Sequence, residues 1–306
     1  SEALAGVNAI MAPPISDLSA ARSRDQGFDG MKGVEGTRFY SEIERLGQFI
    51  VDYVVSGELD RIYAEFARKH GPMPGRGAVV LGMGSLGAGR LHAHSDLDVI
   101  VIYDADGVDT SDGRRPLPAR TYYARLTQAL ITAMTAPMSE GRLYEMDMRL
   151  RPSGNKGPVA TSWTSFQDYQ INEAWVWEHL ALTRAVAIVG PDDLIRDIDA
   201  FRVALADLRN FETVAPALSK MRARISSVKS DRSVWNFKIG PGRLQDIELF
   251  SQMGSLLAGQ KEQSVAAGIA GLVDLGIIDQ AQGDTLKTAY EQFWTLMQTR
   301  ERRYVV

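Results

Sequence analysis

The sequence predicts an α+β domain followed by a helical domain. Three short runs in the first half of the chain have the length and pattern of strands, and helical periodicity surrounds them. Beyond about Ser162 the periodicity is helical only, with breaks at glycine- and serine-rich points. We therefore expect an irregular segment over residues 1–37, a domain with a small sheet over 38–160 and a helical domain over 161–306.

Each element of the first domain has its own signal. Helices are indicated by apolar residues at three- and four-residue spacing, and the first helix is ended by the proline- and glycine-rich stretch that begins at Gly71. Two strands are apolar on both faces, as buried central strands are, whereas the third alternates apolar with charged residues. The expected elements are a helix over about 39–69, strands over 78–82 and 97–103, a helix over 119–135 and a strand over 143–150.

Composition excludes several classes of protein. The 306 residues are 45% apolar and 24% charged, as in ordinary globular proteins, and the net charge of −4 gives no bulk attraction to nucleic acid. The absence of cysteine excludes disulfides and thiolate metal sites. We find neither a membrane-spanning run nor a signal peptide, and we expect a cytoplasmic protein. The chain begins at Ser1 without methionine, so we expect it to be part of a longer protein.

A glycine-rich turn follows the first expected strand. It reads Gly82-Met-Gly-Ser-Leu-Gly87, so Gly84 would let a ligand approach the backbone and Ser85 could donate a hydroxyl. A helix that starts after the turn would present amide groups that suit a phosphate. The alternative is an ordinary tight turn, and the turn alone does not decide between the two.

Two aspartates open the second expected strand. Asp96 and Asp98 are two residues apart, so their side chains lie on the same face of the strand. Two neighbouring carboxylates repel each other at the end of a buried strand, and a hard divalent cation such as Mg²⁺ relieves that repulsion. A pair of solvated loop aspartates is the alternative.

The strand expected over 143–150 carries another carboxylate. Its apolar residues share one face, while Asp147 and Arg149 fall on the opposite, polar face, which Arg151 extends. If this strand pairs with the one that contains Asp98, three carboxylates could hold two magnesium ions. The two arginines would then offset negative charge on bound phosphates.

A zinc site is a further alternative for the same segment. His92 and His94 alternate with Asp96 and Asp98, and imidazole and carboxylate groups are suitable zinc ligands. The chain contains only 4 histidines and no cysteine. We therefore expect the two histidines to lie on a loop surface.

Three later segments have both structural and functional interpretations. Trp175 and Trp177 lie on an expected helix, where packing explains them better than a stacking platform does. Segment 238–248 is either a glycine-proline turn before a helix or a loop that closes on a substrate. The basic residues before it form either a solvated face or a guide for an acidic partner; they are Lys220, Arg222, Arg224, Lys229 and Arg232.

Five longer strings of residues identify a family resemblance. They are Gly82-Met-Gly-Ser-Leu-Gly87, Ser95-Asp-Leu-Asp-Val-Ile100, Tyr144-Glu-Met-Asp-Met-Arg-Leu-Arg-Pro-Ser-Gly154, Asp168–His179 and Lys238–Glu248. Together they resemble the glutamine synthetase adenylyltransferase/adenylyl-removing enzyme, from about residue 60 to the end of the chain. The combination is far more specific than any one motif.

The resemblance implies a fold, a reaction and a set of partners. The fold is the nucleotidyltransferase fold of the DNA polymerase β type, with a small mixed sheet followed by a helical bundle. Asp96, Asp98 and Asp147 match the family's metal-binding carboxylates one by one, with two Mg²⁺ ions and ATP as substrate. A tyrosine hydroxyl of glutamine synthetase would attack the α-phosphate and release pyrophosphate. The PII signalling protein and glutamine would act as effectors, with no role for nucleic acid or a membrane.

The direction of the reaction and one phosphate contact stay open. The sequences of residues 151–154 and 172–179 are closer to the catalytic half of the family's enzymes that adds AMP than to the half that removes it by phosphorolysis. An inactive regulatory module is a third possibility. The family's usual Gly-Lys-Leu-Gly-Gly loop is Gly84-Ser-Leu-Gly-Ala88 here, so Arg90 and Lys238 are candidates for the missing charge. The residues expected to bind nucleotide are Gly84, Ser85, Ser95, Arg149, Arg151 and Lys238.

Overall fold

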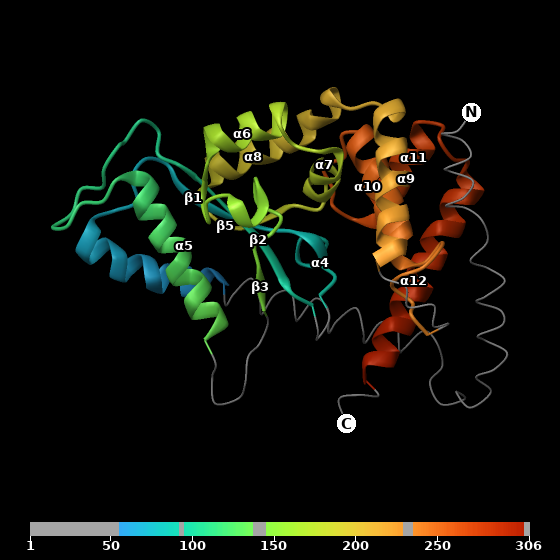
Figure 1. Ribbon diagram of the computed structural model, residues 1–306, viewed down its shortest axis with the longest axis horizontal. Coiled ribbons are helices and arrows are strands. Elements are labelled where there is room, and N and C mark those ends of the chain that lie inside the picture. Colours follow the sequence, from blue (N-terminus) through green and yellow to red (C-terminus); the bar gives the residue numbers. More distant parts are fainter. Residues whose placement is uncertain (1–54, 92–94, 137–144, 229–234, 303–306) are drawn as a thin grey trace. The chain divides into compact units, whose positions relative to one another are not determined.

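The computed structural model describes residues 55–91, 95–136, 145–228 and 235–302 (Figure 1). These residues form two compact units, one that ends at Arg202 and one that begins at Val203. The division therefore lies well after the boundary expected between residues 160 and 161. The segment expected to be irregular, residues 1–37, lies outside the described residues.

A small mixed sheet is the centre of the first unit. Its two long strands, β1 (Gly77–Gly82) and β2 (Leu97–Asp104), pair in antiparallel fashion. Strand β5 (Val186–Val189) adds to the free edge of β1, again antiparallel. On the other side of β2, β3 (Met146–Asp147) and β4 (Thr161–Ser162) pair with it in parallel at different points along its length. The sequence-based expectation of an α+β fold with a small mixed sheet is confirmed.

Two details of the sheet differ from expectation. The strand expected over 143–150 is reduced to β3 in its described part, because the chain turns at Arg149. No strand was expected after Ser162, and this is wrong for β5. Its four residues, Val-Ala-Ile-Val, are too few to distinguish a strand from a buried helix by periodicity. Pairing with β1 shows that these residues form a strand. The first unit therefore includes β5 and continues to Arg202.

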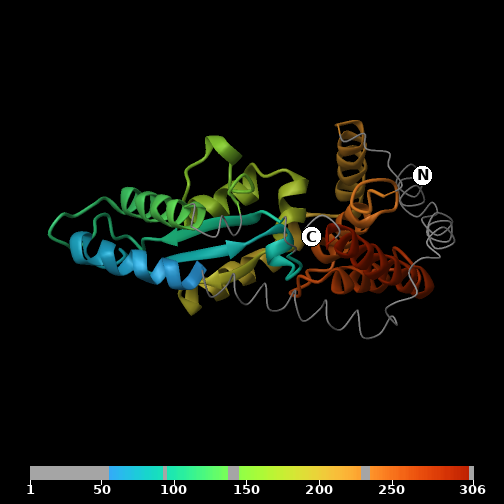
Figure 2. The same cartoon turned by 90° about the horizontal axis from the view of Figure 1, so that it is seen from below.

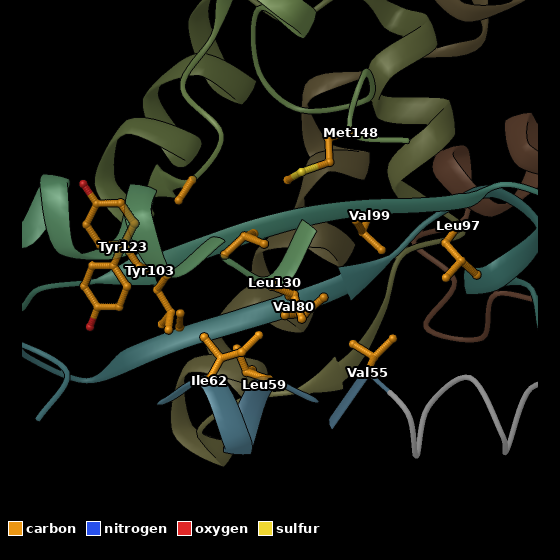
Figure 3. Close-up of a cluster of buried hydrophobic side chains, with 14 of the residues drawn as sticks. Val55, Leu59, Ile62, Val80, Leu97, Val99, Tyr103, Tyr123, Leu130 and Met148 are labelled. Atoms are coloured by element: carbon orange, nitrogen blue, oxygen red, sulfur yellow. The ribbon is translucent and has the colours of Figure 1, made fainter. Parts of the chain in front are cut away.

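One face of the sheet is covered by a helix over residues 55–70 and by α5 (Ala119–Thr135). Val55, Leu59 and Ile62 recur at helical spacing, and they join Val80, Val99 and Tyr103 of the strands in one buried cluster (Figure 3). In Figure 2 this face is turned toward the viewer, with both helices running along the strands.

The opposite face is covered by the helices that follow β3. A turn of 3₁₀ helix, η1 (Gly154–Lys156), leads through β4 into α6 (Trp163–Asn172), which contacts β2. Helix α7 (Val176–Leu182) precedes β5, and α8 (Asp192–Ala204) follows it. Ile100 and Ile102 on this face are buried, as are Val99 and Val101 on the other. The middle of β2 is therefore covered on both faces, as its apolar sequence indicates.

Every labelled element of the second unit is a helix. They are η2 (Leu205–Leu208), α9 (Phe211–Val228), α10 (Leu244–Leu257), α11 (Val265–Asp274) and α12 (Gln280–Arg302). Helices α10 and α11 approach each other closely at Gly254 and Gly268, where a Cβ on Gly268 would lie 2.2 Å from the carbonyl oxygen of Ser251. No helix in the described ranges is both long and apolar enough to cross a membrane.

Candidate active site

One end of the sheet collects the residues that the sequence singles out. Strands β1 and β2 pair with Gly82 opposite Val99, and the next amide, that of Met83, donates to the carbonyl oxygen of Asp98 at 2.8 Å. On the other side of β2, Asp98 pairs with Asp147 of β3 in parallel register. Paired residues of adjacent strands share a face, so the two carboxylates lie on the same side of the sheet. The glycine-rich turn and two of the three expected aspartates thus meet at one sheet end.

The turn is shaped around the carboxylate of Asp98. Gly84 has a φ of +54°, and a Cβ at this position would lie 2.3 Å from Oδ2 of Asp98. A side chain is therefore excluded both by the backbone conformation and by the carboxylate. The turn continues as a single short helical turn, α4 (Gly84–Gly87), which the fully buried Leu86 anchors in the core. Ser85 lies in this turn and is partly exposed.

Asp98 lies in a strongly anionic environment. The pKa of its carboxyl group is raised to about 6. Burial is the largest cause, and the negative charges of Asp147 and Asp96 act in the same direction. The positive charges of Arg149 and Arg184 act in the opposite direction. Excess negative charge at a partly buried carboxylate is the condition that a bound cation relieves.

Asp147 has a different electrostatic balance. Burial alone would raise its pKa, but hydrogen bonds from Arg149 outweigh burial and lower it. The backbone amide of Arg149 donates to Oδ1 at 2.8 Å and its Nε donates to Oδ2 at 2.7 Å, while Nη2 also contacts Oδ2. The guanidinium group of Arg149 is therefore bound to the carboxylate of Asp147, which the sequence analysis expects to bind a metal ion.

The oxygen donors at this sheet end suit a hard cation in their chemistry. Asp98 has surplus negative charge, Asp147 is in register with it, and Asp96 is exposed directly before β2. Within the described ranges, however, no three histidine, aspartate or glutamate side chains gather closely enough to hold a metal ion. His92 and His94, the basis of the zinc alternative, lie outside the described residues.

The remaining expected ligands take several positions. Ser95 is buried directly before Asp96. Arg151 donates from Nη1 to the carbonyl oxygen of Met148 at 2.7 Å and from Nε to that of Gly157 at 3.4 Å, so it ties the loop after β3 together. Lys238 is exposed and belongs to the second unit. Their contacts with a nucleotide stay predictions.

A further arginine, Arg184, reaches this sheet end without having been singled out in the sequence. It precedes β5, whose Val186 pairs with Gly82, the first residue of the glycine-rich turn. A Cβ on Gly87 would lie 1.8 Å from the carbonyl oxygen of Arg184, so the two backbones are in direct contact. Arg184 is only 6% exposed. Its position depends on β5, the strand that the sequence analysis missed, and a single arginine between threonine and alanine forms no motif.

The two tryptophans of the α6–α7 region do not pack as expected. Trp175 is 71% exposed and Trp177 is 41% exposed. Their turn is nevertheless held by the buried Glu178, which accepts hydrogen bonds from the hydroxyl of Tyr169 and from the amide of Trp175, both at 2.8 Å. The packing interpretation is wrong for Trp175, whose side chain is presented to the outside by a fixed backbone.

Arg222 of the basic run and the loop before α10 have structural partners within the second unit, whereas Lys229 and Arg232 lie outside the described residues. Arg222 of α9 donates from Nε to Oδ1 of Asp246 at 2.8 Å, and Asp246 also accepts from the amide of Gly242 at 2.9 Å. The amide of Gln245 donates to the carbonyl oxygen of Lys238 at 3.0 Å. These contacts favour the structural interpretation of 238–248, and Arg222 is part of an ion pair rather than of a solvated face.

Comparison with known proteins gives a consistent result. The family described as glutamate-ammonia ligase adenylyltransferase matches residues 31–201. A bifunctional glutamine synthetase adenylyltransferase/adenylyl-removing enzyme of Rhizobium meliloti (strain 1021) is 45% identical over 211 residues, which are 68% of this chain and 21% of the relative. Enzymes of the same name from Mesorhizobium japonicum and Bradyrhizobium diazoefficiens are 41% and 37% identical, each over 81% of this chain and 26% of the relative. The chain thus spans about a fifth to a quarter of the length of these relatives.

Proposed function

Because this chain belongs to the glutamate-ammonia ligase adenylyltransferase family, we propose that it carries a catalytic centre that transfers AMP from ATP to a tyrosine hydroxyl of glutamine synthetase and releases pyrophosphate. The observation that carries the proposal is the register of Asp98 with Asp147 beside the turn at Gly84. This arrangement offers carboxylates to a cation and a close backbone approach to a phosphate at the same place.

The metal-binding residues in this proposal are Asp96, Asp98 and Asp147, and the ions are two Mg²⁺. When bound, the ions supply charge to the phosphates and lower the pKa of the attacking hydroxyl group. The hydroxyl belongs to the protein substrate, so the chain itself contributes no nucleophile. Its own residues bind and orient the nucleotide.

Arg149 has two positions in the proposal. In the structure it holds the carboxylate of Asp147, and its side chain is largely exposed. If Asp147 held a cation instead, the guanidinium of Arg149 would lie beside the same sheet end, where its planar donors would suit phosphate oxygens. Ser85 would add a hydroxyl donor from the turn, and Ser95, Arg151 and Lys238 stay candidate ligands.

The reverse chemistry is the second candidate function. In that reaction inorganic phosphate attacks the AMP-tyrosine ester and releases ADP, with the tyrosine hydroxyl regenerated. The names of the relatives contain both activities, and this chain covers only part of each relative. The amino-acid sequences of residues 151–154 and 172–179 favour addition of AMP. Control by glutamine and the PII signalling protein would belong to the same system and stays a proposal.

The test is transfer of labelled AMP. The protein is incubated with glutamine synthetase, magnesium and ATP labelled at the α-phosphate, and label on the acceptor is measured. Asp98→Asn and Asp147→Asn should each lower transfer on the order of a thousandfold, because several kcal/mol of charge stabilisation are lost. Asp104→Asn is the matched control, since Asp104 lies at the other end of β2 and pairs with Arg76 at 3.1 Å.

Four outcomes of this experiment and of the reverse assay would argue against the proposal. Transfer that survives both site substitutions would remove the carboxylates from the chemistry. Equal loss in the Asp104→Asn control would point to damage of the fold. Release of ADP from adenylylated glutamine synthetase and phosphate, without forward transfer, would establish the reverse function, and the absence of both activities would identify a regulatory module.

A further inference from the structure

We propose that Arg184 binds the phosphates of the nucleoside triphosphate and supplies the positive charge that the glycine-rich turn lacks. This inference rests on the proposed function, because it assigns a ligand within the same site. It concerns a residue outside the motifs that identify the family and outside the nucleotide-binding set expected from the sequence.

The first support is the position of Arg184 in the sheet. Antiparallel pairing of β5 with β1 places Val186 beside Gly82, so the residues before β5 lie beside those that follow β1. The backbone contact between Arg184 and Gly87 fixes the two segments against each other. Helix α7 and the turn after it, where the amide of Arg184 donates to the carbonyl oxygen of Ala181 at 3.2 Å, hold the other side. Arg184 is therefore mounted on ordered backbone at the sheet end that contains Asp98.

The second support is the charge environment. Arg184 is 6% exposed, and a buried guanidinium group is costly unless anions surround it. Arg149 follows β3, which pairs with β2, and Arg184 precedes β5, which pairs with β1 on the other side of the sheet. The carboxylates at the sheet end are thus flanked by an arginine on each side.

The third support is comparison with the three cations that the sequence analysis expected to bind nucleotide. The side chain of Arg149 is 69% exposed and is engaged by Asp147. Arg151 is bound to two backbone carbonyl groups, and Lys238 belongs to the second unit. Arg184 combines burial, a fixed backbone and contact of that backbone with the glycine-rich turn. Its planar, multidentate donor group also suits phosphate oxygens better than a lysine does.

Arg202 shows what a purely structural buried arginine looks like in the same unit. It is 8% exposed, its Nε lies 3.7 Å from Oδ1 of Asp199, and its Nη1 donates to the carbonyl oxygen of Thr183 at 3.5 Å. Its partners belong to α8 and to the turn before β5, away from the glycine-rich turn that Arg184 contacts. Arg202 is therefore a suitable control for the loss of a buried guanidinium.

The experiment compares binding of two ligands by calorimetry in the presence of Mg²⁺. The ligands are α,β-methylene-ATP, which keeps the triphosphate, and AMP, which lacks the outer phosphates. Arg184→Gln should weaken binding of the triphosphate about ten- to a hundredfold, as expected for lost hydrogen bonds to charged groups, and change AMP binding less than about threefold. Arg184→Lys should restore part of the affinity. Arg202→Gln should lower the thermal transition without changing the ratio of the two affinities.

The outcomes separate this inference from the proposed function. If the unaltered protein does not bind the triphosphate, the proposed function fails and the inference fails with it. If it binds, and Asp98→Asn disturbs magnesium-dependent binding while Arg184→Gln and Arg184→Lys do not, only the role of Arg184 is wrong. Equal weakening of both ligands in the Arg184 variants would also overturn it, because a structural role predicts that result. Should the glutamine variant not fold, the lysine variant decides, since the same ratio is measured.

Discussion

At the residue scale, the candidate site is a small set of charges that oppose one another. Asp98 has two carboxylates near it, Asp147 is held by Arg149, and Arg184 acts from the other side. Spacing in the sequence predicted the aspartates, because residues two apart on a strand share a face. It did not predict Arg184, since the partner strand that positions this residue carries no local signal.

The pKa of Asp98 leads to a prediction on stability. Since its carboxyl pKa is raised to about 6 in the fold, ionisation of Asp98 disfavours the metal-free fold. The stability that the neutral carboxyl group contributes is present below the unfolded value near 4 and is lost as the pH rises through about 6. Asp98→Asn should therefore stabilise the metal-free protein at pH 7.5 by about 1–3 kcal/mol, and by much less at pH 4.

Urea unfolding in a chelator at the two pH values measures this effect. Addition of magnesium supplies the control, because it should stabilise the unaltered protein and leave Asp98→Asn nearly unchanged. A variant that is less stable than the unaltered protein at pH 7.5 in chelator would show that Asp98 carries no unfavourable charge there.

At the element scale, patterning predicted β1, β2 and the strand that contains β3, but it missed the short strands β4 and β5. The middle of β2 is apolar on both faces and lies between two layers of helices, as its sequence indicates (Figure 1). Strand β5 has too few residues for a period, so its assignment comes from pairing with β1. The contact between Arg149 and Asp147 was likewise hidden, because alternation gives the face of a side chain but not its partner.

Close packing of α10 on α11 gives an element-scale prediction. A Cβ on Gly268 would lie 2.2 Å from the carbonyl oxygen of Ser251, so Gly268→Ala must push the two helices apart. Overpacking of this kind costs about 1–3 kcal/mol in the free energy of unfolding. Gly57→Ala is the matched control, because Gly57 is helical with open space around its Cα and alanine favours a helix by about 0.5–1 kcal/mol.

Urea titration of both variants measures whether each substitution lowers or raises the free energy of unfolding. The two substitutions add the same methyl group, so opposite signs would attribute the difference to the neighbours at each position. A Gly268→Ala variant as stable as the unaltered protein would mean that α10 and α11 are not held at this distance.

At the scale of the whole molecule, the candidate site and the helical packing contacts belong to two different compact units. The first contains the sheet, the aspartates and Arg184, whereas the second is built on Arg222–Asp246 and the glycine contact between α10 and α11. The chain covers 21% to 26% of the relatives described above. Family membership therefore comes from the sequence match, while the reaction and its direction are proposals for the site in the first unit.

The central claim is that Asp98 and Asp147 jointly bind a divalent ion together with a triphosphate. The most direct measurement is a crystal structure with Mn²⁺ and α,β-methylene-ATP, in which anomalous scattering locates the ions. We predict an ion between the two carboxylates, with the guanidinium of Arg149 moved off Asp147 and the phosphates beside the Gly84 turn. A bound nucleotide elsewhere, or an intact Arg149–Asp147 pair with no ion at Asp98, would contradict the claim.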